Sequence, residues 1–149
     1  MTASSWRALS PPARRPGRVL LHQSAVHEAH GAHVFMDYTG FQSGSSHDGT
    51  WMLHHLQQAV SASNLREVHA HVEPFDGSVS PPGFAAVVLI DESHVTAHCY
   101  SDRGWLAIDC FTCGGTDPNT LADALHSELL AAIPTLKLMQ RTHVPRFLH

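Results

Sequence analysis

The chain has 149 residues, a length that suits one domain, and 43% of them are hydrophobic, close to the composition of ordinary globular proteins. The formal net charge is −4 and only 9 residues are Lys or Arg, which excludes a basic surface for nucleic acid. No apolar run approaches the roughly 18–20 residues of a membrane span. The 14 His predict that the net charge changes sign as the pH falls toward about 6.5, the free imidazole value.

The first segment, residues 1–27, shows no sustained hydrophobic periodicity and contains several prolines that would interrupt a helix. We therefore predict a disordered N-terminal tail over 1–27 and a single folded domain over 28–149.

Within the domain, strand-like and helix-like patterns follow one another. Strands are predicted over 32–40, 66–75, 84–91, 94–100, 105–113 and 135–144, and helices over 50–63 and 117–133. Thr50 is the predicted N-cap of the first helix, and Pro134 ends the second. In the strand 66–75, Val68, Ala70 and Val72 are predicted to lie on one side and His69 and His71 on the other. This order indicates the α+β fold class: a two-layer α/β sandwich, with a mainly antiparallel sheet and two helices on one face.

The most reactive part of the sequence is "DESHVTAHCYSDRGWLAIDCFTCGG", residues 91–115. A serine hydroxyl in a strained turn, here Ser93, can attack the carbonyl of the preceding residue, Glu92. The resulting ester can eliminate to dehydroalanine, which hydrolyses to a pyruvoyl group and ammonia and leaves the chain broken between Glu92 and Ser93. Such a ketone is an electrophile and an electron sink. Cys113 can return a proton to carbon after a decarboxylation if its surroundings set its pKa.

This segment resembles the signature of the bacterial and archaeal S-adenosylmethionine decarboxylase proenzymes. In that family a Glu-Ser-His cleavage site is followed by a second His four residues after the first. A Gly-aromatic strand then ends in Asp-x-Phe-Thr-Cys-Gly. The matching residues here are Glu92, Ser93, His94, His98, Gly104, Trp105, Asp109, Phe111, Thr112, Cys113 and Gly114. The resemblance extends more loosely over residues 31–135.

The resemblance implies a role for each matching residue. Ser93 would become the pyruvoyl group that forms the Schiff base with substrate, so that no metal or pyridoxal phosphate is expected. His98 would transfer the proton in self-cleavage, and Cys113 would be the catalytic proton donor. Asp102 and Val95 would bind substrate. The family also implies a small-molecule substrate, polyamine (spermidine) synthesis, and a homodimer of cleaved protomers with sites at the subunit interface.

The sequence departs from the family pattern around the substrate. The family usually has His-Thr-Trp-Pro-Glu where this chain has "HCYSD", so the acidic partner is at best Asp102, one methylene shorter. The aromatic residue that would stack on adenine is missing unless Phe75 or Phe84 substitutes, and a hydroxyl that would line the site is replaced by Ala85. Relatives that decarboxylate ornithine or arginine are known, and these changes keep that alternative open.

The three cysteines, Cys99, Cys110 and Cys113, are an odd number in one short segment and make a poor disulfide framework. They indicate a reducing compartment and predict a cytoplasmic protein. Cys110 and Cys113 match the C-x-x-C spacing of zinc sites, but their odd offset on a strand points them to opposite faces, which weakens chelation. We predict that Cys99 and Cys110 are packing residues.

Two further alternatives remain. A non-catalytic relative could regulate a true decarboxylase, although it would not need Glu92, Ser93, His98 and Cys113 together. A metal-binding domain is suggested by His69 and His71, which would project from one face of a strand. Surface His pairs are common in a chain so rich in His.

Overall fold

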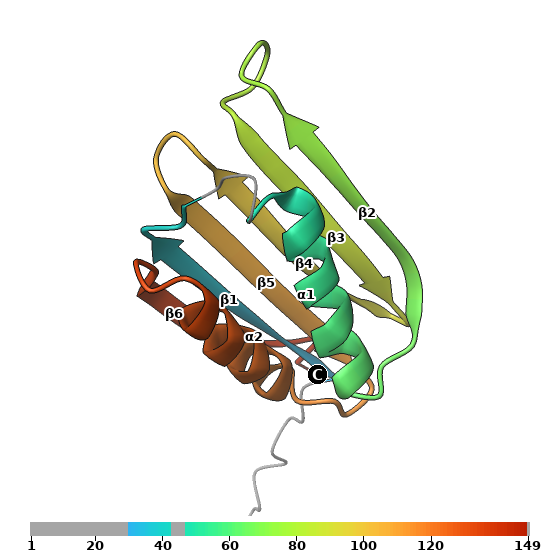
Figure 1. Ribbon diagram of the computed structural model, residues 1–149. Coiled ribbons are helices and arrows are strands. Elements are labelled where there is room, and N and C mark those ends of the chain that lie inside the picture. The colour runs from blue at the N-terminus through green and yellow to red at the C-terminus, as the bar shows by residue number, and fades with distance from the viewer. Residues whose placement is uncertain (1–29, 43–46, 149) are drawn as a thin grey trace, which may run out of the picture.

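The computed structural model describes residues 30–42 and 47–148, so the predicted tail over 1–27 lies outside the described part. Its eight elements follow the predicted order (Figure 1). They are β1 (Gly31–Thr39), α1 (Gly49–Ala62), β2 (Glu67–Phe75), β3 (Gly83–Ile90), β4 (Ser93–Tyr100), β5 (Trp105–Cys113), α2 (Pro118–Ala132) and β6 (Lys137–Arg146). Within the described ranges, no helix is both long enough and apolar enough to cross a membrane.

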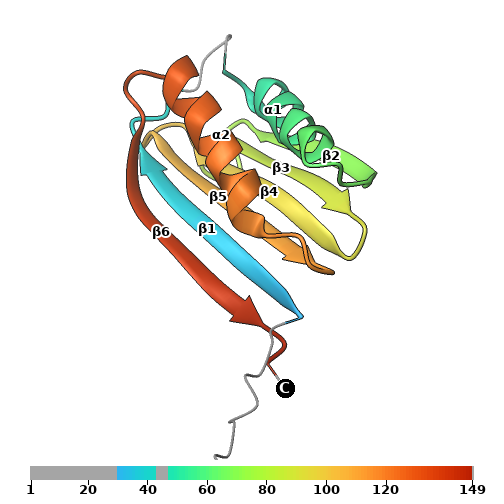
Figure 2. The same ribbon diagram turned by 90° about the horizontal axis from the view of Figure 1, so that it is seen from below.

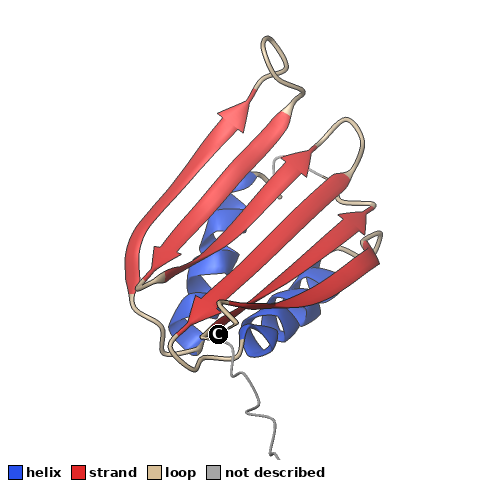
Figure 3. Cartoon of the chain, turned by 180° about the vertical axis from the view of Figure 1, so that it is seen from behind, coloured by secondary structure: helices blue, strands red, loops and turns tan. Residues whose placement is uncertain are grey.

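The six strands form one sheet in the order β2-β3-β4-β5-β1-β6, and every neighbouring pair is antiparallel. Helix α1 packs over β2 and β3, and α2 packs over β5 and β1, so both helices cover the same face (Figure 2). Figure 3 views the sheet from the other side, which no described element covers. We call this side the open face. The predicted α+β two-layer sandwich is confirmed.

The core lies between the sheet and the helices. Along each central strand, alternate side chains are buried on the helix side, as the two-residue period of a strand requires. The predicted apolar stripe of α2, at Leu121, Leu125 and Leu129, is fully buried there. The remaining side chains of the same strands lie on the open face. Sequence alternation therefore decides which residues are core and which are available for chemistry.

Two local predictions are wrong. Asp48 is the N-cap of α1 in place of Thr50, because its Oδ1 accepts a hydrogen bond from the backbone N–H of Trp51 at 2.8 Å. Val68 does not share the side of Ala70 and Val72, which pack against the core, and is 55% exposed. The register between β2 and β3 shifts between Glu67 and His69, so Val68 is the unpaired residue of an irregularity and turns outward.

Gly40 ends β1 with a φ of 80°, and a Cβ added there would lie 2.1 Å from the carbonyl oxygen of Thr135. We expect Gly40→Ala to lower the free energy of unfolding by about 3 kcal/mol, because both the left-handed backbone and the collision oppose a side chain. Gly77 is the matched control. Its φ is 91°, but a Cβ there would make only ordinary contacts with Pro82, so Gly77→Ala should cost about 1 kcal/mol. Urea unfolding measures both, and equal losses would contradict the role of the Thr135 contact.

Candidate active site

The turn between β3 and β4 is strained at one position. Ile90 pairs with Ser93, so Asp91 and Glu92 alone form the connection. Glu92 has a φ of 61°, a left-handed conformation that costs a non-glycine residue free energy. Asp91 is held by Arg66, whose Nε and Nη2 donate to the carboxylate at 2.6 and 2.5 Å. The strain therefore falls directly before Ser93.

Ser93 and Cys113 lie side by side. The backbone N–H of Cys113, the last residue of β5, donates to the hydroxyl oxygen of Ser93 at 3.0 Å. The thiol of Cys113 is half-buried and lies over β1, where a Cβ on Gly31 would be 3.0 Å from the sulfur. Glu92 also reaches this point, since a Cβ on Gly114 would lie 3.9 Å from its Oε2. The structure thus brings the predicted cleavage residues and the predicted proton donor to one end of the sheet, which we call the Ser93 end.

His98 and Asp102 lie elsewhere. His98 is five residues beyond Ser93 on the same strand, which corresponds to roughly 16 Å. Their odd offset also points the two side chains to opposite faces of the sheet, and His98 is exposed on the open face. Asp102 is exposed in the connection between β4 and β5, farther still from Ser93. Within one protomer the structure does not assemble the predicted site.

One departure from the family pattern, Ala85, lies directly beside His98 in the sheet. His98 pairs with Ala85 on β3 and with Ala107 on β5, so neither neighbour presents a polar side chain. A cavity of about 260 Å³ adjoins it. Its lining residues are Phe75, Ser80, Pro81, Phe84, His98, Cys99 and Tyr100. We call this end of the open face the His98 end.

Two expected substrate contacts are corrected. Phe84 is only 3% exposed and its ring packs edge-on against Phe41, with centroids 6.0 Å apart, so it cannot stack on a ligand. Phe75, which lines the cavity beside His98, is the remaining aromatic candidate of the two. Val95 is 0% exposed because it faces the helices, so its side chain cannot contact substrate.

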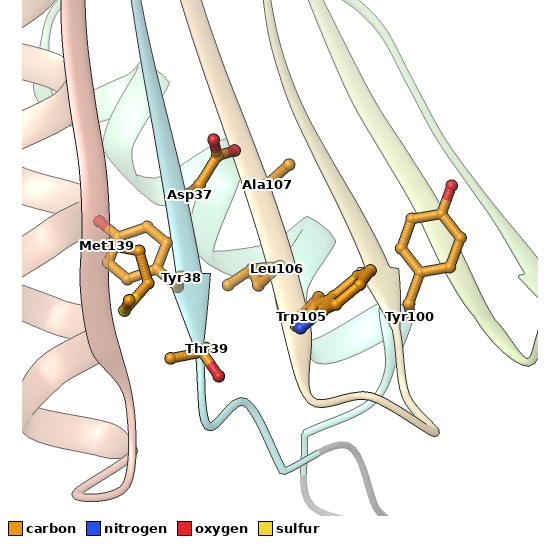
Figure 4. A pocket seen from close by; sticks show the side chains of 8 residues that line it. All are labelled: Asp37, Tyr38, Thr39, Tyr100, Trp105, Leu106, Ala107 and Met139. Carbon is orange, nitrogen blue, oxygen red and sulfur yellow. The ribbon is translucent and has the colours of Figure 1, made fainter.

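A second cavity, of about 390 Å³, also lies at the His98 end (Figure 4). Its wall is formed by Asp37, Tyr38 and Thr39 of β1, Trp105, Leu106 and Ala107 of β5, Tyr100 of β4 and Met139 of β6. Met139 enters the wall because β6 contains an extra residue where its register with β1 shifts between Asp37 and Tyr38. Sequence periodicity carries no signal for that shift, so this cavity was not predicted.

The cysteines behave as their alternation predicts. Cys110 is fully buried and Cys99 nearly so, while Cys113 faces the other way. Burial raises the pKa of the Cys99 thiol to about 11 and that of Cys110 to about 12, so both stay protonated at neutral pH. Both are core residues, as expected.

A group of polar and aromatic side chains flanks Cys113 on the open face. His33 Nε2 lies 3.2 Å from Asp109 Oδ1, and the Thr96 hydroxyl donates to the other carboxylate oxygen at 3.4 Å. The ring of His94 lies 6.0 Å from that of His33 and 5.4 Å from that of Phe111. The motif included His94, Asp109 and Phe111, whereas His33 joins them only because β1 lies beside β5.

The chain is similar in sequence to known proteins of one family. Residues 32–142 match the S-adenosylmethionine decarboxylase family. The S-adenosylmethionine decarboxylase proenzyme of Brevibacillus brevis is 35% identical over 100 residues, which are 66% of this chain and 72% of that protein. The proenzyme of Bacillus velezensis is 34% identical over 107 residues, covering 68% of this chain and 80% of the relative.

A solved structure shares the fold. The crystal structure of the adenosylmethionine decarboxylase from Aquifex aeolicus matches with a TM-score of 0.63 at 22% identity, covering 82% of this chain and 94% of that one. The class of protein is therefore a decarboxylase that is made as a proenzyme. The chain belongs to the S-adenosylmethionine decarboxylase family, which confirms the resemblance read from residues 92–114.

The charge environment of His94 can be measured directly. Burial first, and then the neighbouring charge of His33, lower the pKa of His94; Asp109 opposes this shift and Arg146 adds to it. We expect NMR titration to place the pKa of His94 below the free value of about 6.5, and Arg146→Gln to raise it.

The same shift links His94 to stability. Because the unfolded chain binds this proton more tightly, the contribution of His94 is present above the unfolded pKa and is lost as the pH falls through the lower folded value. His94→Gln should flatten that part of the stability profile. A His94 that titrates at or above 6.5 would contradict the placement of these groups.

Proposed function

We propose that this chain is a self-cleaving, pyruvoyl-dependent decarboxylase of S-adenosylmethionine that breaks between Glu92 and Ser93. The observation that carries the proposal is the strained backbone of Glu92 directly before Ser93, whose hydroxyl is held by the N–H of Cys113. The names of the relatives, all proenzymes of S-adenosylmethionine decarboxylase, support the same activity and processing.

The residues at the Ser93 end fit the formation of a pyruvoyl group. The Ser93 hydroxyl attacks the carbonyl carbon of Glu92, and the peptide nitrogen leaves to give an ester. Elimination of the main-chain carboxylate of Glu92 from this ester leaves dehydroalanine at position 93. Addition of water to its imine tautomer then releases ammonia and leaves the pyruvoyl group. The left-handed backbone at Glu92 costs roughly 1–3 kcal/mol, and cleavage of the bond relieves it. Once formed, the pyruvoyl group would supply an electrophilic carbonyl and an electron sink for decarboxylation. Cys113 then delivers the proton to carbon.

The division of the site supports a homodimer through the open face. Ser93 and Cys113 lie at one end of the sheet, while His98 and Asp102 lie toward the other. If two copies pack their open faces together about a twofold axis, the Ser93 end of one protomer meets the His98 end of its partner. The open face also carries exposed apolar side chains that such a partner would cover. These are Leu89, Tyr100, Trp105, Met139 and Val144.

A second substrate class is favoured by one observation. Phe84 is buried away from the open face, and the position opposite His98 is occupied by Ala85, so fewer groups remain to hold an adenosyl moiety. Ornithine or arginine needs no such contacts. Release of labelled CO₂ from each of the three amino acids separates the candidates.

The proposal includes a cytoplasmic location. The free cysteines Cys99, Cys110 and Cys113 are consistent with a reducing compartment.

Processing is tested by intact mass under denaturing conditions. We expect two chains, 1–92 and 93–149, with the second lighter by one ammonia than simple hydrolysis would leave it. Ser93→Ala should abolish cleavage and decarboxylation together. Cys113→Ala should preserve cleavage and lower the decarboxylation rate at least about 100-fold, the range of a lost general acid. A wild-type chain that stays whole would favour the non-catalytic regulatory relative.

The shared site is tested by complementation. Cys113→Ala damages the Ser93 end, and Asp102→Asn damages the His98 end, so each homodimer should be weakly active. In a mixed dimer one site carries both substitutions and the other carries none. We expect mixing under conditions of subunit exchange to restore roughly a quarter of wild-type activity per protomer, since half of the dimers are mixed and half of their sites are intact. No recovery, with exchange shown by mass spectrometry, would place each site in one protomer.

A further inference from the structure

Arg146, near the C-terminus, lies in line with Cys113 across the open face. Arg146 on β6 pairs with Gly31 on β1, and Gly31 pairs with Cys113 on β5. Two strand spacings separate β6 from β5, about 10 Å of backbone distance. Because Gly31 has no side chain, nothing from β1 stands between the arginine and the Ser93 end.

The guanidinium crosses this gap. Its Cζ lies 5.3 Å from the ring centroid of Phe111 on β5, two residues before Cys113, and 5.7 Å from that of Phe147. Its positive charge helps to lower the pKa of His94. The positive charge of a β6 residue is therefore located at the Ser93 end of the sheet, although β6 is an edge strand and Ser93 begins β4.

This guanidinium has unused hydrogen-bonding capacity. Among the ion pairs of the described residues, none includes Arg146. The nearest acidic group of the cluster, Asp109, already accepts from Thr96 and pairs with His33. The other arginine of β6, Arg141, is instead bound to Asp123 on α2. Five donors in a planar fork, next to a ring that excludes water, are suited to a carboxylate.

We propose that Arg146 binds the α-carboxylate of the substrate beside the position of Ser93, and so determines which amines can occupy the site. The inference rests on the proposed function. It does not depend on which amino acid is the substrate, because S-adenosylmethionine, ornithine and arginine all carry this carboxylate. Arg146 is then a specificity-determining residue that selects an amino acid over the corresponding amine.

The reaction defines the kinetic signature of such a residue. Decarboxylation breaks the bond between the α-carbon and the carboxylate, the electron pair stays on the α-carbon, and neutral CO₂ leaves. The charge that the guanidinium stabilises is therefore greatest in the bound substrate and declines toward the transition state. Arg146 should lower KM without raising kcat.

The experiment compares Arg146→Gln with the wild type, using S-adenosylmethionine, or the other amino acid if the CO₂ assay identifies one. We expect a KM higher by about 10- to 100-fold, as for a lost charge-assisted hydrogen bond, and a kcat that is unchanged or slightly higher. Calorimetry should show the decarboxylated product binding to both proteins within about twofold, because it lacks the carboxylate. Arg146→Lys should recover part of the loss, since it keeps the charge but not the fork.

Arg141→Gln is the matched control. Arg141 lies on the same strand but faces the helices, where it is bound to Asp123 on α2, so this variant removes one positive charge away from the open face. It should leave KM and kcat as in the wild type. Equal increases in KM for both variants would mean that net charge alone is responsible and would overturn the proposal.

Two other results would also overturn it. Substrate and product could lose affinity equally in Arg146→Gln, or light scattering could show that the variant no longer dimerises, which would make Arg146 an interface residue. The intact mass under denaturing conditions distinguishes a failure of this proposal from a failure of the proposed function. An uncut wild type rejects the function, whereas cleavage and an unchanged KM in Arg146→Gln reject only the role of Arg146. Calorimetry with the product involves no turnover, and in an uncut chain neither ligand reacts, so Arg146 can be tested in either case.

Discussion

The two-residue period of β4 is the constraint on which the arrangement of the site depends. Val95, Ala97 and Cys99 must face the helices to complete the core, and this places His98 on the open face. Ser93 is an odd number of residues away, at the far end of the strand. A one-residue shift that moved His98 toward Ser93 would bury polar side chains under the helices and expose the apolar ones. The packing of the core thus keeps the side chains of His98 and Ser93 apart within one protomer.

The same alternation in β5 places polar and aromatic side chains on the open face near the Ser93 end. Leu106, Ile108 and Cys110 pack under the helices, so Asp109, Phe111 and Cys113 lie on the open face. The backbone N–H of Cys113 holds the Ser93 hydroxyl, while its thiol lies over Gly31. The family motif in β5 is therefore both a core strand and a surface for reaction, and each function uses one set of alternate residues.

The fold was largely predictable because the signals are local. All eight elements were expected within a few residues, and the burial of Leu121, Leu125 and Leu129 followed from helical spacing. One of the two local errors lies where a neighbouring strand overrides local preference. Val68 alternates correctly in the sequence, yet a register shift against β3 turns it outward. Asp48 caps α1 although Thr50 has an equally suitable side chain, because the helix begins at Gly49.

For the site, the residues from Glu92 to Gly114 were sufficient to identify the family, and they predict the reactive positions. Their relative placement could not be read from spacing, because it depends on which strands are neighbours. The pairing of β1 with β5 brings His33 to Asp109, and the pairing of β6 with β1 brings Arg146 to Phe111. A short segment of sequence is enough to show which reactive side chains are present. The position of Arg146 beside Phe111 depends on the order of strands that are far apart in the sequence, and the separation of His98 from Ser93 depends on how β4 packs in the sheet.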